Sequence, residues 1–165
     1  MVEVTVSRLG IDSATSSYVV ILREKDGRRF LPIWIGKPEA ESILMQMNQI
    51  SRERPLTHDL CKALIVALGG TLRKVTVSRV HKNTYFAELH IEAETGAIQV
   101  DARPSDSIAI ALRLDAPIFV EPSLLNTRDD DEDAPDEMAP EGMTPGELKA
   151  YLEMLRPEDF GKFKP

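Results

Sequence analysis

The first residues of the chain alternate between apolar and polar side chains, which predicts a sheet. Valine stands at every second position over residues 2–6, and this is the period of a half-buried strand. Further strands are expected over 18–23 and 30–35, joined at Asp26-Gly27, a pair that favours a tight hairpin. Pro32 has no N–H, so its strand is expected at an edge of the sheet or at a bulge.

The spacing of apolar residues then changes to that of helices. An amphipathic helix is predicted to begin near Pro38, because apolar side chains recur every three or four residues up to position 50. A second helix over 57–68 is apolar on nearly every side and is therefore expected to be buried. It should end at Gly69-Gly70, as a C-terminal cap does. A third helix is expected over 105–114.

The remaining strands complete the predicted domain. A hairpin is expected around Lys82-Asn83, between strands over 75–80 and 85–93, followed by short strands over 98–101 and 118–120. Together these elements predict an α+β domain over residues 1–125, with about three helices packed on a mixed, mainly antiparallel sheet.

The chain changes character at residue 126. Five consecutive acidic residues occupy positions 129–133, and this composition predicts a solvated, flexible linker over 126–143. Thr144 and Glu147 have the spacing of a capping box, and apolar residues follow at helical spacing. Residues 144–165 are therefore expected to form a short C-terminal helix and tail. The apolar stripe of that helix would dock on its own core or on a second subunit.

Charge is distributed unevenly along the chain, which has a formal net charge of −7. Residues 1–125 carry 15 basic and 15 acidic residues, whereas residues 126–165 carry 5 and 12. The predicted domain is thus neutral, which permits a phosphate site but provides no broad basic face. One cysteine, Cys61, allows no disulfide or cysteine-based zinc site within the chain. Without a signal peptide pattern or an apolar run long enough for a bilayer, a cytoplasmic protein with no membrane association is expected.

Two similar Arg-Pro elements each precede a predicted helix. Arg54-Pro55 is followed by Thr57, His58 and Asp59, and Arg103-Pro104 is followed by Ser105 and Asp106. One interpretation is local: Thr57 and Ser105 cap the helices, and the carboxylates complement the helix dipole. The other is functional, because two guanidinium groups and the free N–H groups of helix N-termini together form a site for phosphate.

Candidate site residues follow from the functional interpretation. Carboxylates and an imidazole at the two helix starts could hold a divalent cation, Mg²⁺ or Mn²⁺, or activate water for phosphodiester hydrolysis. His58 could equally bond the local backbone, and Trp34 could stack on a base or pack in a core or interface. The candidates for catalysis are His58, Asp59, Asp101 and Asp106, those for phosphate binding are Arg54, Arg103, Thr57 and Ser105, and those for metal binding are Asp101 and Asp106.

Four ordered segments closely resemble the hallmark segments of the bifunctional nuclease family. The resemblance covers essentially residues 1–125, and it implies an α+β fold peculiar to that family, homo-oligomeric assembly as a dimer or larger, and cleavage of both DNA and RNA. The segments are Phe30-Leu31-Pro32-Ile33-Trp34-Ile35-Gly36 with Glu39-Ala40, Arg54-Pro55-Leu56-Thr57-His58-Asp59-Leu60, Asp101-Ala102-Arg103-Pro104-Ser105-Asp106-Ser107, and Pro117-Ile118-Phe119-Val120.

These observations lead to one principal hypothesis and two alternatives. The principal hypothesis is a nuclease that hydrolyses DNA and RNA with little sequence preference, assisted by a metal or by arginine. One alternative is a non-catalytic regulatory module that binds a phosphate or nucleotide, which the neutral charge of residues 1–125 would suit. The other is an oligomeric interaction protein in which the Arg-Pro loops brace a subunit interface.

Overall fold

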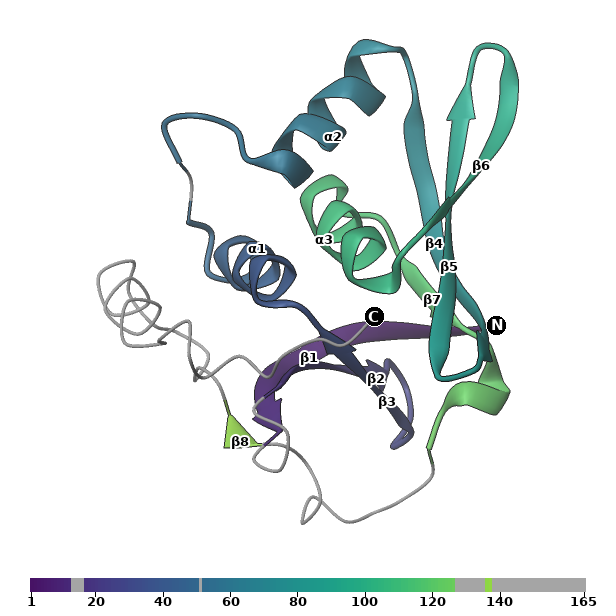
Figure 1. The fold of residues 1–165 in the computed structure, drawn as a ribbon. Helices are drawn as coiled ribbons and strands as arrows, with labels where there is room; N and C mark the ends of the chain where they lie inside the picture. The colour runs from purple at the N-terminus through teal and green to yellow at the C-terminus, as the bar shows by residue number, and fades with distance from the viewer. Residues whose placement is uncertain (13–16, 51, 127–135, 138–165) are drawn as a thin grey trace.

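Strands from both halves of the chain join into one mixed sheet in the computed structural model, which describes residues 1–12, 17–50, 52–126 and 136–137. The strand order is β3-β2-β1-β7-β4-β5-β6 (Figure 1). The strands are β1 (Val2–Asp12), β2 (Ser17–Glu24), β3 (Phe30–Ile35), β4 (Thr71–His81), β5 (Thr84–Ala93), β6 (Gly96–Ala102) and β7 (Ile118–Val120). The helices are α1 (Lys37–Met47), α2 (Thr57–Ala67) and α3 (Pro104–Leu114), with a short 3-10 turn, η1 (Pro122–Leu124). The predicted α+β fold is confirmed.

The short strand β7 connects the two antiparallel parts of the sheet. It pairs antiparallel with β1 and parallel with β4, and every other pairing in the strand order is antiparallel. Two residues from the predicted acidic linker, β8 (Asp136–Glu137), pair with β1 at Gly10 and Ile11. The predicted C-terminal helix over 144–165 lies outside the described residues.

The three helices lie on one side of the sheet (Figure 1). Fully buried aliphatic side chains from both layers meet between them, including Val20, Leu22, Ile43, Val75 and Ile108. These residues recur every second position in the strands and every three or four positions in the helices, which is why the hydrophobic pattern predicted the elements. No helix among the described residues has the length and apolarity needed to cross a membrane.

Turn and edge chemistry also agrees with the sequence. Lys82 and Asn83, at the tip of the β4–β5 hairpin, both have positive φ, as a two-residue turn matched to the strand twist requires. Pro32 lies in β3, which stands at the end of the strand order and, among the described residues, pairs with β2 and through Phe30 with Asn126. The prediction of an edge strand is confirmed. Gly69 has a φ of 74° directly after α2, so the predicted left-handed cap is confirmed.

Two helix predictions were wrong. The N-cap positions are Leu56 and Arg103, so Thr57 and Ser105 lie inside the first turn and do not cap it. Moreover α2 is not buried: among its eleven residues only His58 is in the buried class. The helix packs against the core through its Cys61 and Ile65 side, and its other apolar residues face outward.

Candidate functional site

His58 joins all three helices through its two ring nitrogens. Its Nδ1 lies 2.8 Å from Oγ of Ser42 on α1, and its Nε2 lies 3.0 Å from Oδ1 of Asp106 on α3. An ionised carboxylate only accepts hydrogen bonds, so Nε2 carries the proton and donates to Asp106. The Ser42 hydroxyl, which can both donate and accept, shares the second hydrogen bond with Nδ1. His58 and Ser42 are both buried, so this series of hydrogen bonds starts in the core.

The hydrogen bonds continue from Asp106 to the surface through Arg103. Arg103 donates from Nε to Oδ2 of Asp106 at 2.6 Å and from Nη2 to Oδ1 at 3.0 Å, so the pair is bidentate. Nη2 also donates to Oε1 of Glu39, at the start of α1, at 2.8 Å. The side chain of Arg103 is 66% exposed, whereas that of Glu39 is 13% exposed. Among these hydrogen-bonded side chains, Arg103 is therefore the one that an external ligand reaches first.

The electrostatics of Asp106 follow from these contacts. Partial burial acts to raise the pKa of Asp106, but hydrogen bonds from Arg103 and His58 outweigh it and hold the pKa below its ordinary value. The hydrogen bonds that Arg103 donates to Asp106, with a smaller contribution from Glu39, raise the pKa of Arg103. Asp106 is thus a carboxylate at neutral pH, with acceptor bonds on both oxygens.

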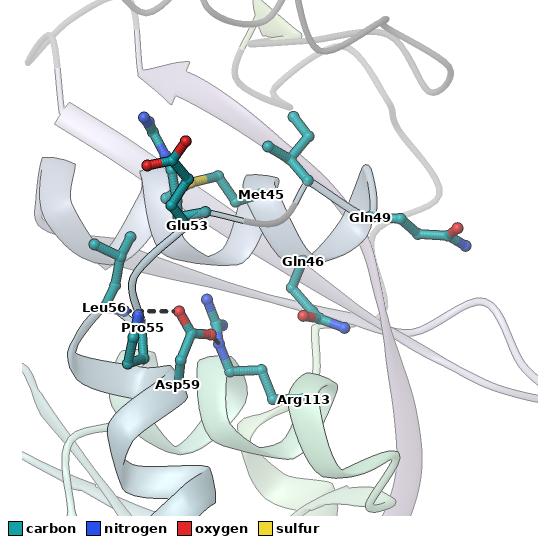
Figure 2. A pocket seen from close by; sticks show the side chains of 10 residues that line it. Met45, Gln46, Gln49, Glu53, Pro55, Leu56, Asp59 and Arg113 are labelled. Carbon is teal, nitrogen blue, oxygen red and sulfur yellow. Dashed lines mark hydrogen bonds and ion pairs between the residues drawn. The ribbon is translucent and has the colours of Figure 1, made fainter.

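A second ion pair also joins α2 to α3. Arg113 on α3 donates from Nε to Oδ1 of Asp59 at 2.6 Å, and the other Asp59 oxygen accepts from the backbone N–H of Leu56 at 2.9 Å (Figure 2). Burial acts to raise the pKa of Asp59, and these two bonds lower it to below its usual range. Arg113 is buried and also donates to the carbonyl oxygens of Ala109 and Ser42. This arginine therefore ties α1, α2 and α3 together.

The two Arg-Pro elements open onto different cavities. The first, of about 490 Å³, lies beside Pro55, Leu56, Asp59 and Arg113 (Figure 2). The second, of about 410 Å³, is bordered by Arg103, Pro104 and Ser105 and is named here the Arg103 pocket. The two helix starts are linked through His58 and Asp106, but they do not share a single cleft.

The Arg103 pocket has features of a phosphate and base site. Helices α1 and α3 both begin at it, because Gly36 and Lys37 border it together with the first residues of α3. Helix N-termini carry free N–H groups and a positive partial charge, and Lys37 and Arg103 add two cationic side chains. Trp34 also borders the pocket, with half of its surface exposed. Its Nε1 donates to Oδ2 of Asp12 at 2.9 Å, which orients the ring.

The other predicted site residues lie apart from this network. Asp101 is an exposed residue of β6 and pairs in register with Glu88, while its neighbour Val100 pairs with the buried Leu89. Since successive side chains alternate between faces, Asp101 projects from the face opposite the helices. Arg54 and Thr57 are exposed at the start of α2, and Ser105 is buried at the start of α3.

The predicted cation ligands do not fit one metal ion as they are placed. Asp101 and Asp106 face different sides of the sheet, and both oxygens of Asp106 already accept hydrogen bonds. Among the described residues there is no group of three His, Cys, Asp or Glu side chains placed to hold a metal.

Sequence reasoning missed Ser42, Glu39, Lys37 and Arg113. Ser42 lies inside the amphipathic helix α1, where a serine is expected to face solvent. Arg113 lies in the last turn of α3, where an arginine is expected to complement the helix dipole. One signal was available, because Glu39 belongs to a family-like segment. Another is that a lysine follows the Gly36 helix start, a position suited to anions.

Comparison with known proteins identifies the family. The model of the bifunctional nuclease domain matches residues 20–132. Uncharacterized protein Rv1829 of Mycobacterium tuberculosis is 38% identical over 97% of this chain and 98% of its own length. Bifunctional nuclease 2 of rice (Oryza sativa subsp. japonica) is 30% identical over 84% of this chain, and Bifunctional nuclease 2 of Arabidopsis thaliana is 32% identical over 61%. The matches span only 44% and 32% of those two plant proteins.

Proposed function

Because the chain belongs to the bifunctional nuclease domain family, we propose that it hydrolyses phosphodiester bonds of DNA and RNA with little sequence preference, and that the Arg103 pocket binds the scissile phosphate. The observation that carries the proposal is the meeting of two helix N-termini, Lys37 and Arg103 at one cavity. Each of these elements favours an anion, and together they provide directed donors for phosphate oxygens.

Arg103 can bind phosphate without first losing its carboxylate partners. Its described contacts use Nε and Nη2, so the two protons on Nη1 can reach a phosphate oxygen. Glu39 and Asp106 fix the guanidinium plane at the edge of the pocket, which reduces the entropy lost when a ligand binds. A pocket of about 410 Å³ is within the range of small-ligand sites and admits one nucleotide unit.

Trp34 provides a sequence-independent contact for a base. An exposed indole stacks on any base, because every base has a π-face, and this agrees with little sequence preference. Tyr85 borders the same pocket, and its burial raises the pKa of its hydroxyl, which therefore stays protonated as a donor.

Asp106 is the proposed proton-transfer group, and His58 positions its carboxylate. In the arrangement described above, Asp106 is a weak base, because Arg103 and His58 donate hydrogen bonds to its oxygens and lower its pKa. A bound phosphate would compete with Asp106 for Arg103. Each hydrogen bond that Arg103 transfers to the phosphate raises the pKa of Asp106 and frees an oxygen to accept a proton from the attacking water. The water oxygen then bonds to phosphorus as the P–O bond to the leaving sugar oxygen breaks, and the proton held on Asp106 passes to that leaving oxygen. His58 holds the carboxylate in place through its hydrogen bond to Oδ1.

Cleavage of labelled single-stranded DNA and RNA by the purified protein tests the proposal. Arg103→Ala should lower kcat/KM by roughly 100-fold or more, as expected for loss of a group that stabilises transition-state charge. Trp34→Ala should weaken binding by roughly 1–3 kcal/mol through the loss of stacking. Arg73→Ala is the matched control, because Arg73 is an exposed arginine paired with Glu92 outside the pocket. Equal cleavage by wild type and Arg103→Ala would contradict the proposal.

Chelation tests whether a divalent cation is required. Cleavage assays in Mg²⁺, in Mn²⁺ and in EDTA are expected to give similar rates if Arg103 supplies the charge stabilisation. Loss of activity in EDTA that Mg²⁺ or Mn²⁺ restores would instead show that substrate completes a metal site which the described residues do not form alone.

A non-catalytic module that binds nucleotides is the second candidate function. One observation favours it: both nitrogens of His58 and both oxygens of Asp106 are already engaged by protein groups. Isothermal titration with mononucleotides separates the two functions. Binding that Arg103→Ala abolishes, in a protein that leaves DNA and RNA uncut, would support the module.

A further inference from the structure

The outward side of α2 forms, with the edge strand β6, an apolar surface that is named here the α2–β6 face. It is defined by five large hydrophobic side chains that are between 39% and 81% exposed, namely Leu60, Leu64, Leu68, Ile98 and Val100. These five make up half of the ten large hydrophobic residues found exposed in the described part of the chain. Monomers rarely leave so many apolar residues together in water.

The helix side and the strand side of this face are continuous. A Cβ built on Gly70 would lie 3.3 Å from Cγ2 of Ile65 on α2 and 3.0 Å from Cγ2 of Ile91 on β5, so these two side chains flank the glycine. Ile91 pairs in register with Ile98 of β6, and directly paired residues project from the same face of a sheet. Apolar side chains therefore extend without interruption from α2 across β5 to β6.

The orientation of α2 leaves this surface open. His58 and Asp59 contact α3, so the opposite side of the helix, with Leu60, Leu64 and Leu68, points away from the other helices. Figure 1 shows α2 at the outside of the helical layer and β6 at the end of the sheet. Helix and strand each lack a neighbour on this side among the described residues.

We propose that the α2–β6 face is the contact surface for a second copy of this chain. The face is almost without charge. Besides Asp59, Lys62 is the one charged residue of α2, and its spacing from His58 and Asp59 places it at the margin of the face and not among Leu60, Leu64 and Leu68. On this side of the sheet β6 presents only Ile98, Val100 and Ala102. A two-fold contact places each residue against the same surface of its partner, and like charges would repel there. An uncharged apolar face avoids this cost.

The edge strand adds a second argument for a copy of the chain. β6 pairs with β5 alone, so one row of its backbone donors and acceptors is unpaired within the described residues. Two copies related by a two-fold axis present this edge to each other in antiparallel directions and can form one continuous sheet. A lipid surface or a nucleic acid would require a basic rim, which a single lysine does not provide.

The dimensions suit the apolar centre of an interface. Helix α2 is about 16 Å long and β6 about 23 Å long, which gives a footprint on the order of 400 Å². A standard contact takes roughly 800 Å² from each partner, with an apolar centre and a polar rim. The α2–β6 face provides the centre, and the polar residues around it provide the rim.

Sedimentation velocity of the full chain over a range of concentrations tests the proposal. The wild type should form a dimer, and Leu64→Asp and Val100→Lys should each raise the dissociation constant by roughly 10-fold or more. Val80→Asp is the control: Val80 is 45% exposed and lies at the other end of β4, about 30 Å from the start of that strand. It should leave the dimer intact. Circular dichroism and a melting curve would confirm that each variant folds, and Leu64→Ala repeats the test with a milder change.

Hydrogen exchange identifies the surface directly. Amides of α2 and β6 should become more protected as the concentration of the wild type rises, and they should lose this dependence in Leu64→Asp. A wild type that stays monomeric up to about 100 μM overturns the proposal, as does a dimer that both variants retain. Protection of α2 at every concentration in a monomer also overturns it and would show that residues beyond 126 cover the face.

Discussion

Arg113 contacts all three helices through the hydrogen bonds of its side chain. It is buried and donates to Asp59, to Ala109 and to Ser42, on three different helices. Arg113→Met keeps much of the volume but leaves these acceptors without a donor, so we expect the free energy of unfolding in urea to fall by about 1–3 kcal/mol. Arg73→Met is the control, because its pair with Glu92 is exposed and should contribute less than about 1 kcal/mol. Equal losses in both variants would contradict this account.

The pH dependence of stability should depend on Asp106. Arg103 and His58 hold its pKa below the value it has in the unfolded chain, so the folded state is favoured where Asp106 is ionised. The resulting stability is fully present above the unfolded pKa of about 4 and is lost as the pH falls through the lower folded value. Urea titrations should therefore show a wild-type advantage over Asp106→Asn that shrinks as the pH falls below about 4. An advantage that grows as the pH falls below about 4 would have the wrong sign.

At the scale of elements, the turn between α2 and β4 contains two glycines with different requirements. Gly69 has a φ of 74° and open space around its Cβ position, whereas a Cβ on Gly70 would meet the carbonyl oxygen and side chain of Ile65 and the side chain of Ile91. Asparagine tolerates positive φ, so Gly69→Asn should cost less than about 1 kcal/mol. Gly70→Asn should cost more, about 1–3 kcal/mol, because the helix must shift away from the sheet. Thermal unfolding of both variants measures the difference, and the reverse order would refute it.

The elements themselves were largely predictable, because their apolar residues have helical or strand periods and their turns carry distinctive residues such as Lys82-Asn83 and Gly69-Gly70. The exposure of α2 was not predictable from the sequence. Apolar residues such as Leu64 and Leu68 indicate that a surface is covered, but a sequence pattern does not say whether the cover comes from the same chain. The pattern was correct about the chemistry of the helix and wrong about its exposure in a single chain.

The candidate site was predictable only where its residues are neighbours in sequence. His58, Arg103 and Asp106 stand at the two helix starts that the sequence marks, and the structure links them. Their partners come from far along the chain: Ser42 is 16 residues from His58, and Glu39 is 64 residues from Arg103. Such pairs depend on how α1 packs against α2 and α3, and local spacing carries no information about that packing.

At the scale of the whole molecule, charge separates residues 1–125 from the acidic remainder. Residues 1–125 are neutral, while the run Asp129-Asp130-Asp131-Glu132-Asp133 alone contributes five of the negative charges. A negative segment tethered to the domain repels a polyanion and competes with it for cationic groups such as Arg103 and Lys37. Replacing the five residues with asparagine and glutamine in the full chain should therefore tighten the binding of single-stranded DNA.

Fluorescence anisotropy at several salt concentrations measures this effect. Removal of five negative charges should change the dissociation constant by roughly 3- to 10-fold at 20 mM salt, where the Debye length is about 20 Å, and hardly at all near 1 M, where it is about 3 Å. Replacing five neutral residues of the same region with asparagine or glutamine controls for a change in composition. Tighter binding that persists undiminished at high salt would show that the run acts through specific contacts and not through its charge.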